Sequence, residues 1–154
     1  MSLPITVLAP VAGTVISMDQ VPDPVFAGEI VGPGLAIDPR RDPVVTAVAP
    51  VAGKIFKLHP HAYVIVAEGT RGALVHLGLD TVQLGGAGFT LHAAEGDTVE
   101  IGDPVVSWNP AEVEAGGRSP ICPVVALGGK PEAVTPLVTP GTWVAAGDPL
   151  FLWV

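Results

Sequence analysis

Cysteine is almost absent from this 154-residue sequence, which contains only Cys122. A single thiol cannot form an internal disulfide, so a disulfide-stapled secreted fold is excluded and a reducing compartment is favoured. No apolar run reaches the roughly 18 residues that a membrane-spanning helix needs. The opening Met-Ser-Leu-Pro-Ile-Thr also lacks the basic and apolar segments of a secretory signal. We therefore expect a cytoplasmic protein that is not embedded in a membrane.

Basic residues are also scarce. Seven lysines and arginines stand against fifteen aspartates and glutamates, which gives a formal net charge of −8. Nucleic-acid binding needs a basic surface, so that class of function is excluded. An acidic surface would steer a basic protein partner toward the chain, although it also fits ordinary solubility.

Helical periodicity is hard to find, whereas 19 glycines and 17 prolines punctuate valine-rich runs along the whole chain. This pattern predicts an all-β fold. The exception is a short helix predicted at residues 109–115. Asn109 is suited to be its N-cap, Pro110 its first residue and Gly116 its end.

Two internal repeats predict how the strands are organised. Ala-Pro-Val-Ala-Gly occurs at residues 9–13 and again at 49–53, and the strand-turn-strand unit at 96–108 is echoed at 141–153. Each longer unit contains a Gly-Asp-Pro turn. Two similar β-motifs packed as a sandwich or flattened barrel account for both repeats. We expect residues 1–154 to form a single domain.

Three of the four histidines lie in one predicted hairpin. Its strands are residues 62–67 and 73–79, joined by a glycine-rich turn at 68–72. If the turn centres between Glu68 and Gly69, His61 lies opposite His76 with Cβ atoms roughly 4.5–5.5 Å apart. If it centres on Thr70, the register shifts by about one and a half residues per strand. The two imidazoles would still reach one small group in either register.

Two interpretations of these histidines do not involve such a shared group. A lone histidine in an apolar run such as 73–77 is often a hydrogen-bonded core residue. Alternatively, His59, His61, His76 and Asp80 could hold zinc. The spacings His-x-His and His-x-x-x-Asp resemble those of lysostaphin-type zinc peptidases, although there they occur in the opposite order. A zinc-dependent hydrolase is therefore the alternative function.

Several longer motifs are shared with one known family. They are Ala-Pro-Val-Ala-Gly at 9–13 and 49–53, Val-Pro-Asp-Pro-Val-Phe-Ala at 21–27, Ile-Val-Gly-Pro-Gly at 30–34, His-Ala at 61–62, Val-His-Leu-Gly-Leu-Asp-Thr-Val at 75–82, the segment 85–89, Glu-Gly-Asp at 95–97 and Pro-Val-Val at 123–125. With these motifs the chain, from about residue 7 to 154, resembles the enzyme IIA component of glucose/N-acetylglucosamine type. That component belongs to the bacterial phosphoenolpyruvate-dependent sugar phosphotransferase system.

The resemblance implies a β-sandwich with a duplicated hybrid motif. It also implies a phosphocarrier that takes a phosphoryl group from phospho-HPr onto His76 and passes it to a cysteine of a sugar-permease IIB domain. His61 would stabilise the phosphoryl group, and the carbonyl of Gly78 would hold Nδ1 of His76. Neither a metal nor a cofactor is needed. A regulatory binding protein, in which the histidine only reports phosphorylation state, is a third possibility.

Further residues around the site follow from the same resemblance. Asp23 and Asp80 would ring the site and meet a basic donor. An apolar rim for partners would consist of Val25, Phe26, Ile30 and Val31, for which core packing is the competing interpretation.

His59 departs from the family, in which most members have threonine at this position. It could orient His61 or act as a zinc ligand. His92 matches no functional position and is expected on a surface strand. Cys122 is expected to be a buried structural thiol.

Overall fold

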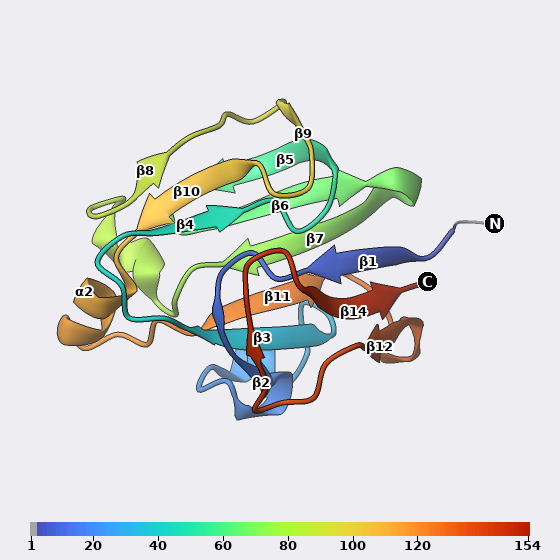
Figure 1. Ribbon diagram of the computed structural model, residues 1–154, viewed down its shortest axis with the longest axis horizontal. Helices are drawn as coiled ribbons and strands as arrows, with labels where there is room; N and C mark the ends of the chain where they lie inside the picture. Colours follow the sequence, from blue (N-terminus) through green and yellow to red (C-terminus); the bar gives the residue numbers. More distant parts are fainter. Residues whose placement is uncertain (1–2) are drawn as a thin grey trace.

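The computed structural model describes residues 3–154, which form fourteen strands and short helices (Figure 1). The strands are β1 (Ile5–Leu8), β2 (Gly13–Ser17), β3 (Gly34–Pro39), β4 (Val45–Val48), β5 (Gly53–His59), β6 (Ala62–Ala67), β7 (Arg71–His76), β8 (Thr90–Leu91), β9 (Thr98–Val99), β10 (Pro104–Trp108), β11 (Cys122–Ala126), β12 (Val134–Pro136), β13 (Trp143–Val144) and β14 (Pro149–Trp153). The α-helices are α1 (Pro24–Ala27) and α2 (Pro110–Ala115). Single 3-10 turns span Met18–Gln20, Glu68–Thr70, Thr81–Leu84 and Pro131–Ala133. The predicted all-β class is confirmed.

The strands form one long sheet and two small ones. The long sheet has the order β13-β2-β3-β11-β7-β6-β5-β9, and the small sheets are β4-β10-β8 and β1-β14-β12. One main hydrophobic cluster contains buried side chains from all three sheets, among them Ile65, Val105 and Phe151. The sheets therefore enclose a shared core, which is the arrangement of a β-sandwich.

The two sequence repeats occupy equivalent places in the fold. In one small sheet β1 pairs with β14, so that Ile5 faces Trp153. In the other, β4 pairs with β10, so that Val45 faces Trp108. The two ends of the long sheet are equivalent in the same way, because β13 pairs with β2 at one end and β9 pairs with β5 at the other. The duplication expected from the sequence is thus a duplication of strand pairing.

The two halves also interlock through their Ala-Pro-Val-Ala-Gly segments. The backbone N–H of Leu8 donates to the carbonyl of Pro50, and the N–H of Val48 donates to the carbonyl of Pro10, each at 3.0 Å. Each half therefore satisfies backbone groups of the other where the strands cross into the long sheet.

The hairpin β6–β7 confirms the first predicted strand and corrects the second. β6 spans Ala62–Ala67 as predicted, whereas β7 begins at Arg71, two residues earlier than predicted, and ends at His76, three residues earlier. The cause of the early start is the turn. Gly69 and Thr70 adopt left-handed backbone conformations with φ of 77° and 60°, which reverses the chain within three residues.

The register of this hairpin lies between the two that the sequence allowed. Ala62 pairs with His76, so the turn centres on Gly69. The register in which His61 lies directly opposite His76 is therefore off by one residue. His61 instead precedes β6, and its carbonyl accepts a hydrogen bond of 2.8 Å from the N–H of Leu77.

Helix α2 is confirmed, with the predicted ends. Asn109 is its N-cap, and the side-chain oxygen of Asn109 accepts a hydrogen bond of 3.0 Å from the N–H of Glu112. Pro110 is the first helical residue and Gly116 the C-cap. The sequence rules for helix ends were sufficient here because all three signals occur together.

Candidate functional site

The chain turns sharply where it leaves β7, just after His76. Gly78 has a φ of 79°, and a Cβ atom at this position would lie 2.7 Å from Cγ2 of Thr81 and 3.0 Å from the carbonyl oxygen of Ser119. Only glycine fits this combination of backbone conformation and close packing. The buried hydroxyl of Thr81 donates to the carbonyl of Leu77 at 2.8 Å and closes the turn.

This turn brings the carbonyl of Gly78 to the imidazole of His76. Nδ1 of His76 lies 2.5 Å from that oxygen. A carbonyl oxygen only accepts hydrogen bonds, so Nδ1 carries the proton in a neutral ring and Nε2 keeps the lone pair. The hydrogen bond that the resemblance implies is therefore present, and it leaves Nε2 with its lone pair free.

A second imidazole lies beside the first. The ring centroids of His61 and His76 are 5.3 Å apart with an interplanar angle of 66°. His59 adds a third ring, stacked on His61 with centroids 5.5 Å apart at 21°. His59 ends β5 and pairs with Ala62, so Pro60 and His61 form the two-residue turn between β5 and β6. The turn, rather than the alternation of an extended strand, brings His59 and His61 to one side.

An aromatic ring packs on the other side of the site. The ring of Phe26 lies 5.2 Å from that of His76, centroid to centroid, at 60°. Phe26 is on α1, a helix that the sequence analysis did not predict. Asp23 caps α1, since its carboxylate accepts a hydrogen bond of 2.9 Å from the N–H of Val25. The first helical residue is a proline, as in α2.

The surroundings keep both site histidines neutral near pH 7. Burial lowers the pKa of His76, while the hydrogen bond to Gly78 and the nearby carboxylates of Asp23 and Asp80 act in the opposite direction. The pKa of His61 is also lowered, first by burial and then by the neighbouring imidazoles of His76 and His59. A neutral His76 retains the lone pair that a nucleophile requires.

Comparison with known proteins agrees with this geometry. Residues 5–132 match the family described as phosphoenolpyruvate-dependent sugar phosphotransferase system, EIIA 1. The chain belongs to this EIIA family. It is 40% identical over 121 residues to the glucose-specific EIIA component of Oceanobacillus iheyensis, covering 79% of this chain and 73% of the relative. It is 44% identical over 121 residues to that of Halalkalibacterium halodurans, covering 77% and 68%.

The fold agrees as well. Glucose permease IIA from Mycoplasma capricolum superimposes with a TM-score of 0.85 at 33% identity, over 98% of this chain and 96% of that one. The EIIA chain is therefore a component of the sugar phosphotransferase system with a phosphotransferase role. Within residues 3–154, no helix combines the length and apolar character needed to cross a membrane.

The acidic and apolar residues expected around the EIIA site differ in how far they are exposed to solvent. Asp80 is exposed at the turn after Gly78, whereas Asp23 is partly buried as the cap of α1. Of the four expected rim residues, Val25 and Ile30 are 42% and 72% exposed, and Phe26 is only 7% exposed. Val31 is partly buried against the second hydrophobic cluster. The side chains of Val25 and Ile30 are thus accessible to a partner, whereas the buried ring of Phe26 packs against the ring of His76.

The zinc hypothesis has no supporting arrangement in the described part of the chain. Among residues 3–154, no group of three or more histidine, cysteine, aspartate or glutamate side chains is placed to hold a metal ion. His59 and His76 each contact the ring of His61, with centroids 5.5 Å and 5.3 Å away.

One supporting residue was missed by the sequence analysis. Thr81 holds the turn after His76 through its buried hydroxyl. Phe26 was expected in the partner rim, with core packing as the competing interpretation, and its buried ring packs on that of His76. The signal for α1 was available in the Asp-Pro pair before Phe26, which is the same capping signature that revealed α2.

The remaining histidine and the cysteine lie outside the site. His92 is exposed, directly after β8, with Nε2 2.6 Å from the hydroxyl oxygen of Ser107. Cys122 is fully buried in β11, and burial raises the pKa of its thiol to about 12. The expectation that this thiol is buried is confirmed.

Proposed function

We propose that this chain is a phosphohistidine carrier, with His76 accepting a phosphoryl group from phospho-HPr and passing it to a cysteine of a sugar-permease IIB domain. The observation that supports this most is the hydrogen bond from Nδ1 of His76 to the carbonyl of Gly78. It fixes the tautomer in which Nε2 is free to attack, beside a second imidazole and without a metal.

The reaction has two balanced steps. The lone pair of Nε2 attacks the phosphorus of the donor phosphohistidine, and the donor's N–P bond breaks with its electron pair returning to the donor ring. A cysteine thiolate of the IIB domain then attacks the same phosphorus, and the electron pair of the new N–P bond returns to Nε2. The proton of His76 stays on Nδ1, hydrogen-bonded to the carbonyl of Gly78, throughout. The donor ring, protonated on its other nitrogen, leaves as a neutral imidazole, so neither step needs a proton relay.

His61 acts as a donor to the phosphoryl oxygens in this proposal. A neutral imidazole has one N–H, and the ring of His61 lies edge-on to that of His76 with centroids 5.3 Å apart, so it is close enough to donate to an oxygen of a phosphoryl group on Nε2 of His76. Phosphoryl transfer depends mainly on positioning and on stabilising charge, so one such donor is sufficient. His59 orients His61 by stacking on it.

The docking face surrounds this histidine pair. Val25 and Ile30 offer exposed apolar side chains near Asp23, and Asp80 adds an exposed carboxylate near His76. A basic partner with an apolar centre would complement this face. HPr and the IIB domain of a IIB/IIC permease would use it in turn. We place the protein in the cytoplasm and treat residues 1–154 as one functional domain.

Mass spectrometry tests the proposal directly. The protein is incubated with phosphoenolpyruvate, enzyme I and HPr, and its intact mass is measured with and without acid treatment. We expect one acid-labile phosphoryl adduct on the parent and on His92→Gln, and none on His76→Gln. His92→Gln is the matched control because it removes an exposed histidine that lies outside the hairpin and bonds to Ser107. An adduct that survives in His76→Gln would refute the assignment. Absence of an adduct together with tight zinc binding would favour the hydrolase.

A further inference from the structure

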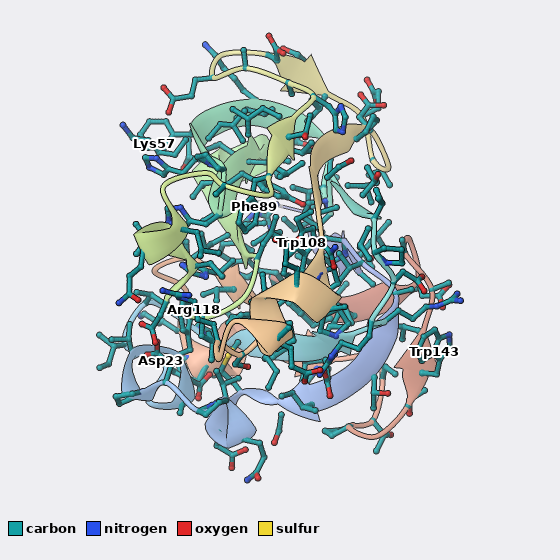
Figure 2. The ribbon with its side chains drawn as sticks, turned by 90° about the vertical axis from the view of Figure 1, so that its left-hand side faces the viewer. Asp23, Lys57, Phe89, Trp108, Arg118 and Trp143 are labelled. Atoms are coloured by element: carbon teal, nitrogen blue, oxygen red, sulfur yellow. The ribbon has the colours of Figure 1, made fainter. Side chains whose placement is uncertain are left out.

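A cavity lies beside α2, on the face of the molecule that Figure 2 presents. Its volume is about 370 Å³, and its apolar lining includes Leu84, Ala87, Phe89 and Val113. This volume is within the range of about 300–1,000 Å³ typical of sites for small molecules. Neither the histidine pair nor the proposed docking residues line it.

One wall of the cavity is aromatic. Phe89 lines the cavity and stacks on the buried Trp108, with ring centroids 6.0 Å apart and planes 7° from parallel. A flat apolar group could extend such a stack, because offset parallel rings attract one another beyond simple burial. The wall therefore favours a planar body in the occupant.

The helix end places a cation at the same cavity. Gly117, after α2, has a φ of 89° and donates its N–H to the carbonyl of Glu114, and the N–H of Arg118 donates to the carbonyl of Val113. These two hydrogen bonds form a Schellman motif, which folds the residue after the left-handed glycine back over the helix. As a result the side chain of Arg118 lines the cavity that Val113 also lines (Figure 2).

The guanidinium of Arg118 lacks an anionic partner in the described part of the chain. Its Nη2 donates to Oε1 of Gln83 at 3.2 Å, but its Nε is buried without a hydrogen-bond partner. The salt bridges found within residues 3–154 all belong to Arg40 and Arg41. A buried charged donor without an acceptor is unfavourable, and a carboxylate is the acceptor that a guanidinium binds best.

A second charge at the cavity limits what can bind. Glu112 also lines it, and its Oε2 lies 3.5 Å from Nδ2 of Asn109. A second negative charge on the occupant would approach this carboxylate, so a phosphate dianion is disfavoured relative to a monoanion.

We propose that this cavity binds a small organic monocarboxylate with a flat apolar body. The carboxylate pairs with Arg118, and the apolar body lies against Phe89 and Val113. Binding here does not depend on phosphorylation of His76. It can nevertheless be sensed at the histidine site, because Cγ1 of Val113 lies only 3.6 Å from where a Cβ of Gly78 would be.

An NMR titration with benzoate tests the proposal, with benzamide as a neutral probe of the same shape. We expect benzoate to shift the Nε–H signal of Arg118 and the methyl signals of Ala87 and Val113, saturating with a Kd of about 1 mM. Intermolecular NOEs from benzoate to Phe89 would locate it in the parent protein without any variant. Benzamide should bind at least tenfold more weakly. The absence of saturable shifts, or equal affinity for the two probes, would overturn the proposal.

A pair of variants separates the cavity from general charge attraction. Arg118→Met keeps the apolar stem and removes the guanidinium, and we expect it to weaken benzoate binding at least tenfold. Arg40→Met removes the same charge from an exposed arginine paired with Asp42, and it should leave the affinity unchanged. Similar losses in both variants would show that benzoate responds to net charge and not to this site.

Discussion

Replacing Gly78 by alanine tests the link between the turn after β7 and the chemistry of His76. A side chain at a φ of 79° costs about 1–2 kcal/mol. The new Cβ would lie 2.7 Å from Cγ2 of Thr81 and 3.0 Å from a backbone oxygen of Ser119. Overpacking of this kind adds about 1–3 kcal/mol. We therefore expect Gly78→Ala to lower the free energy of unfolding by about 2–5 kcal/mol.

The matched control is Gly102→Ala. Gly102 has a φ of 86°, but no atom lies within 4 Å of its Cβ position, so only the backbone cost of about 1–2 kcal/mol applies. Both variants gain equally from restricting the unfolded chain, and that contribution cancels in the comparison. Urea unfolding of the two variants and the parent measures the difference directly.

The same substitution should also impair phosphoryl transfer. Relief of the contact with Thr81 moves the carbonyl of Gly78 away from Nδ1 of His76. The ring of His76 can then adopt the tautomer with the proton on Nε2. In that tautomer Nε2 has no free lone pair with which to attack phosphorus. ¹⁵N NMR of the imidazole reports this change, and transfer from phospho-HPr should fall with it. If Gly78→Ala unfolds no more easily than Gly102→Ala and keeps its Nδ1 proton, the turn does not control the histidine as argued.

Four further predictions concern the same site. His61→Ala should still accept a phosphoryl group but pass it on roughly 10²-fold more slowly, because a donor to the transition state is lost; single-turnover transfer to IIB at the parent's rate would contradict this. Asp23→Asn together with Asp80→Asn should slow transfer from HPr most at low salt, since exposed charges act mainly on association; asparagine keeps the cap of α1, and an unchanged salt dependence would place both acids outside the interface. Burial lowers the pKa of His76 and of His61, so as the pH drops these histidines take up protons in the unfolded chain before they do so in the folded one. The free energy of unfolding should therefore be at its full value above about pH 6.5, and it should fall progressively as the pH drops from there through the folded-state pKa. Urea midpoints across this range should vary less in His61→Gln than in the parent. Finally, His59→Thr should leave transfer nearly intact, whereas loss of transfer in chelator and its recovery with zinc would contradict a metal-free reaction.

Local sequence rules predicted the elements in which several signals coincide. Helix α2 has a capping asparagine, a proline at its first position and a glycine at its end, so both of its ends were predicted correctly. Strand β6 was correct because its apolar run is bounded by a proline on one side and a glycine on the other. Helix α1 was missed because four residues are too few to show a helical period, although its capping signals are the same.

The register of the histidine hairpin shows the limit of such rules. Sequence spacing alone allowed several turn centres, and the choice among them depends on the backbone of Gly69 and Thr70. Thr70 adopts a left-handed conformation that threonine seldom takes, so its residue type gave no indication of it. The approach of His61 to His76 was nevertheless anticipated, because a shift of one residue along a strand still leaves two rings within reach.

The role of Phe26 could not be found from the sequence for a different reason. An aromatic residue in an apolar segment is compatible with a partner-binding rim and with core packing, and the distinction depends on how a distant segment folds against it. Here the end of β7 brings the ring of His76 against Phe26 of α1, which is about fifty residues earlier in the chain. Motif resemblance gave the position of Phe26 near the site but not its contact.

The pairing of β1 with β14 has a consequence for the order of folding during synthesis. Within the described residues, β1 is hydrogen-bonded in its sheet only to β14, with Ile5 facing Trp153. Strand β1 must therefore wait for β14 to be synthesised, and closing so long a loop is entropically costly until the intervening sheets have formed. The histidine hairpin has no such delay, because its strands are joined by a three-residue turn. The histidine hairpin can therefore form while β1 is still unpaired, and β14 then completes the small sheet that holds β1 and β12.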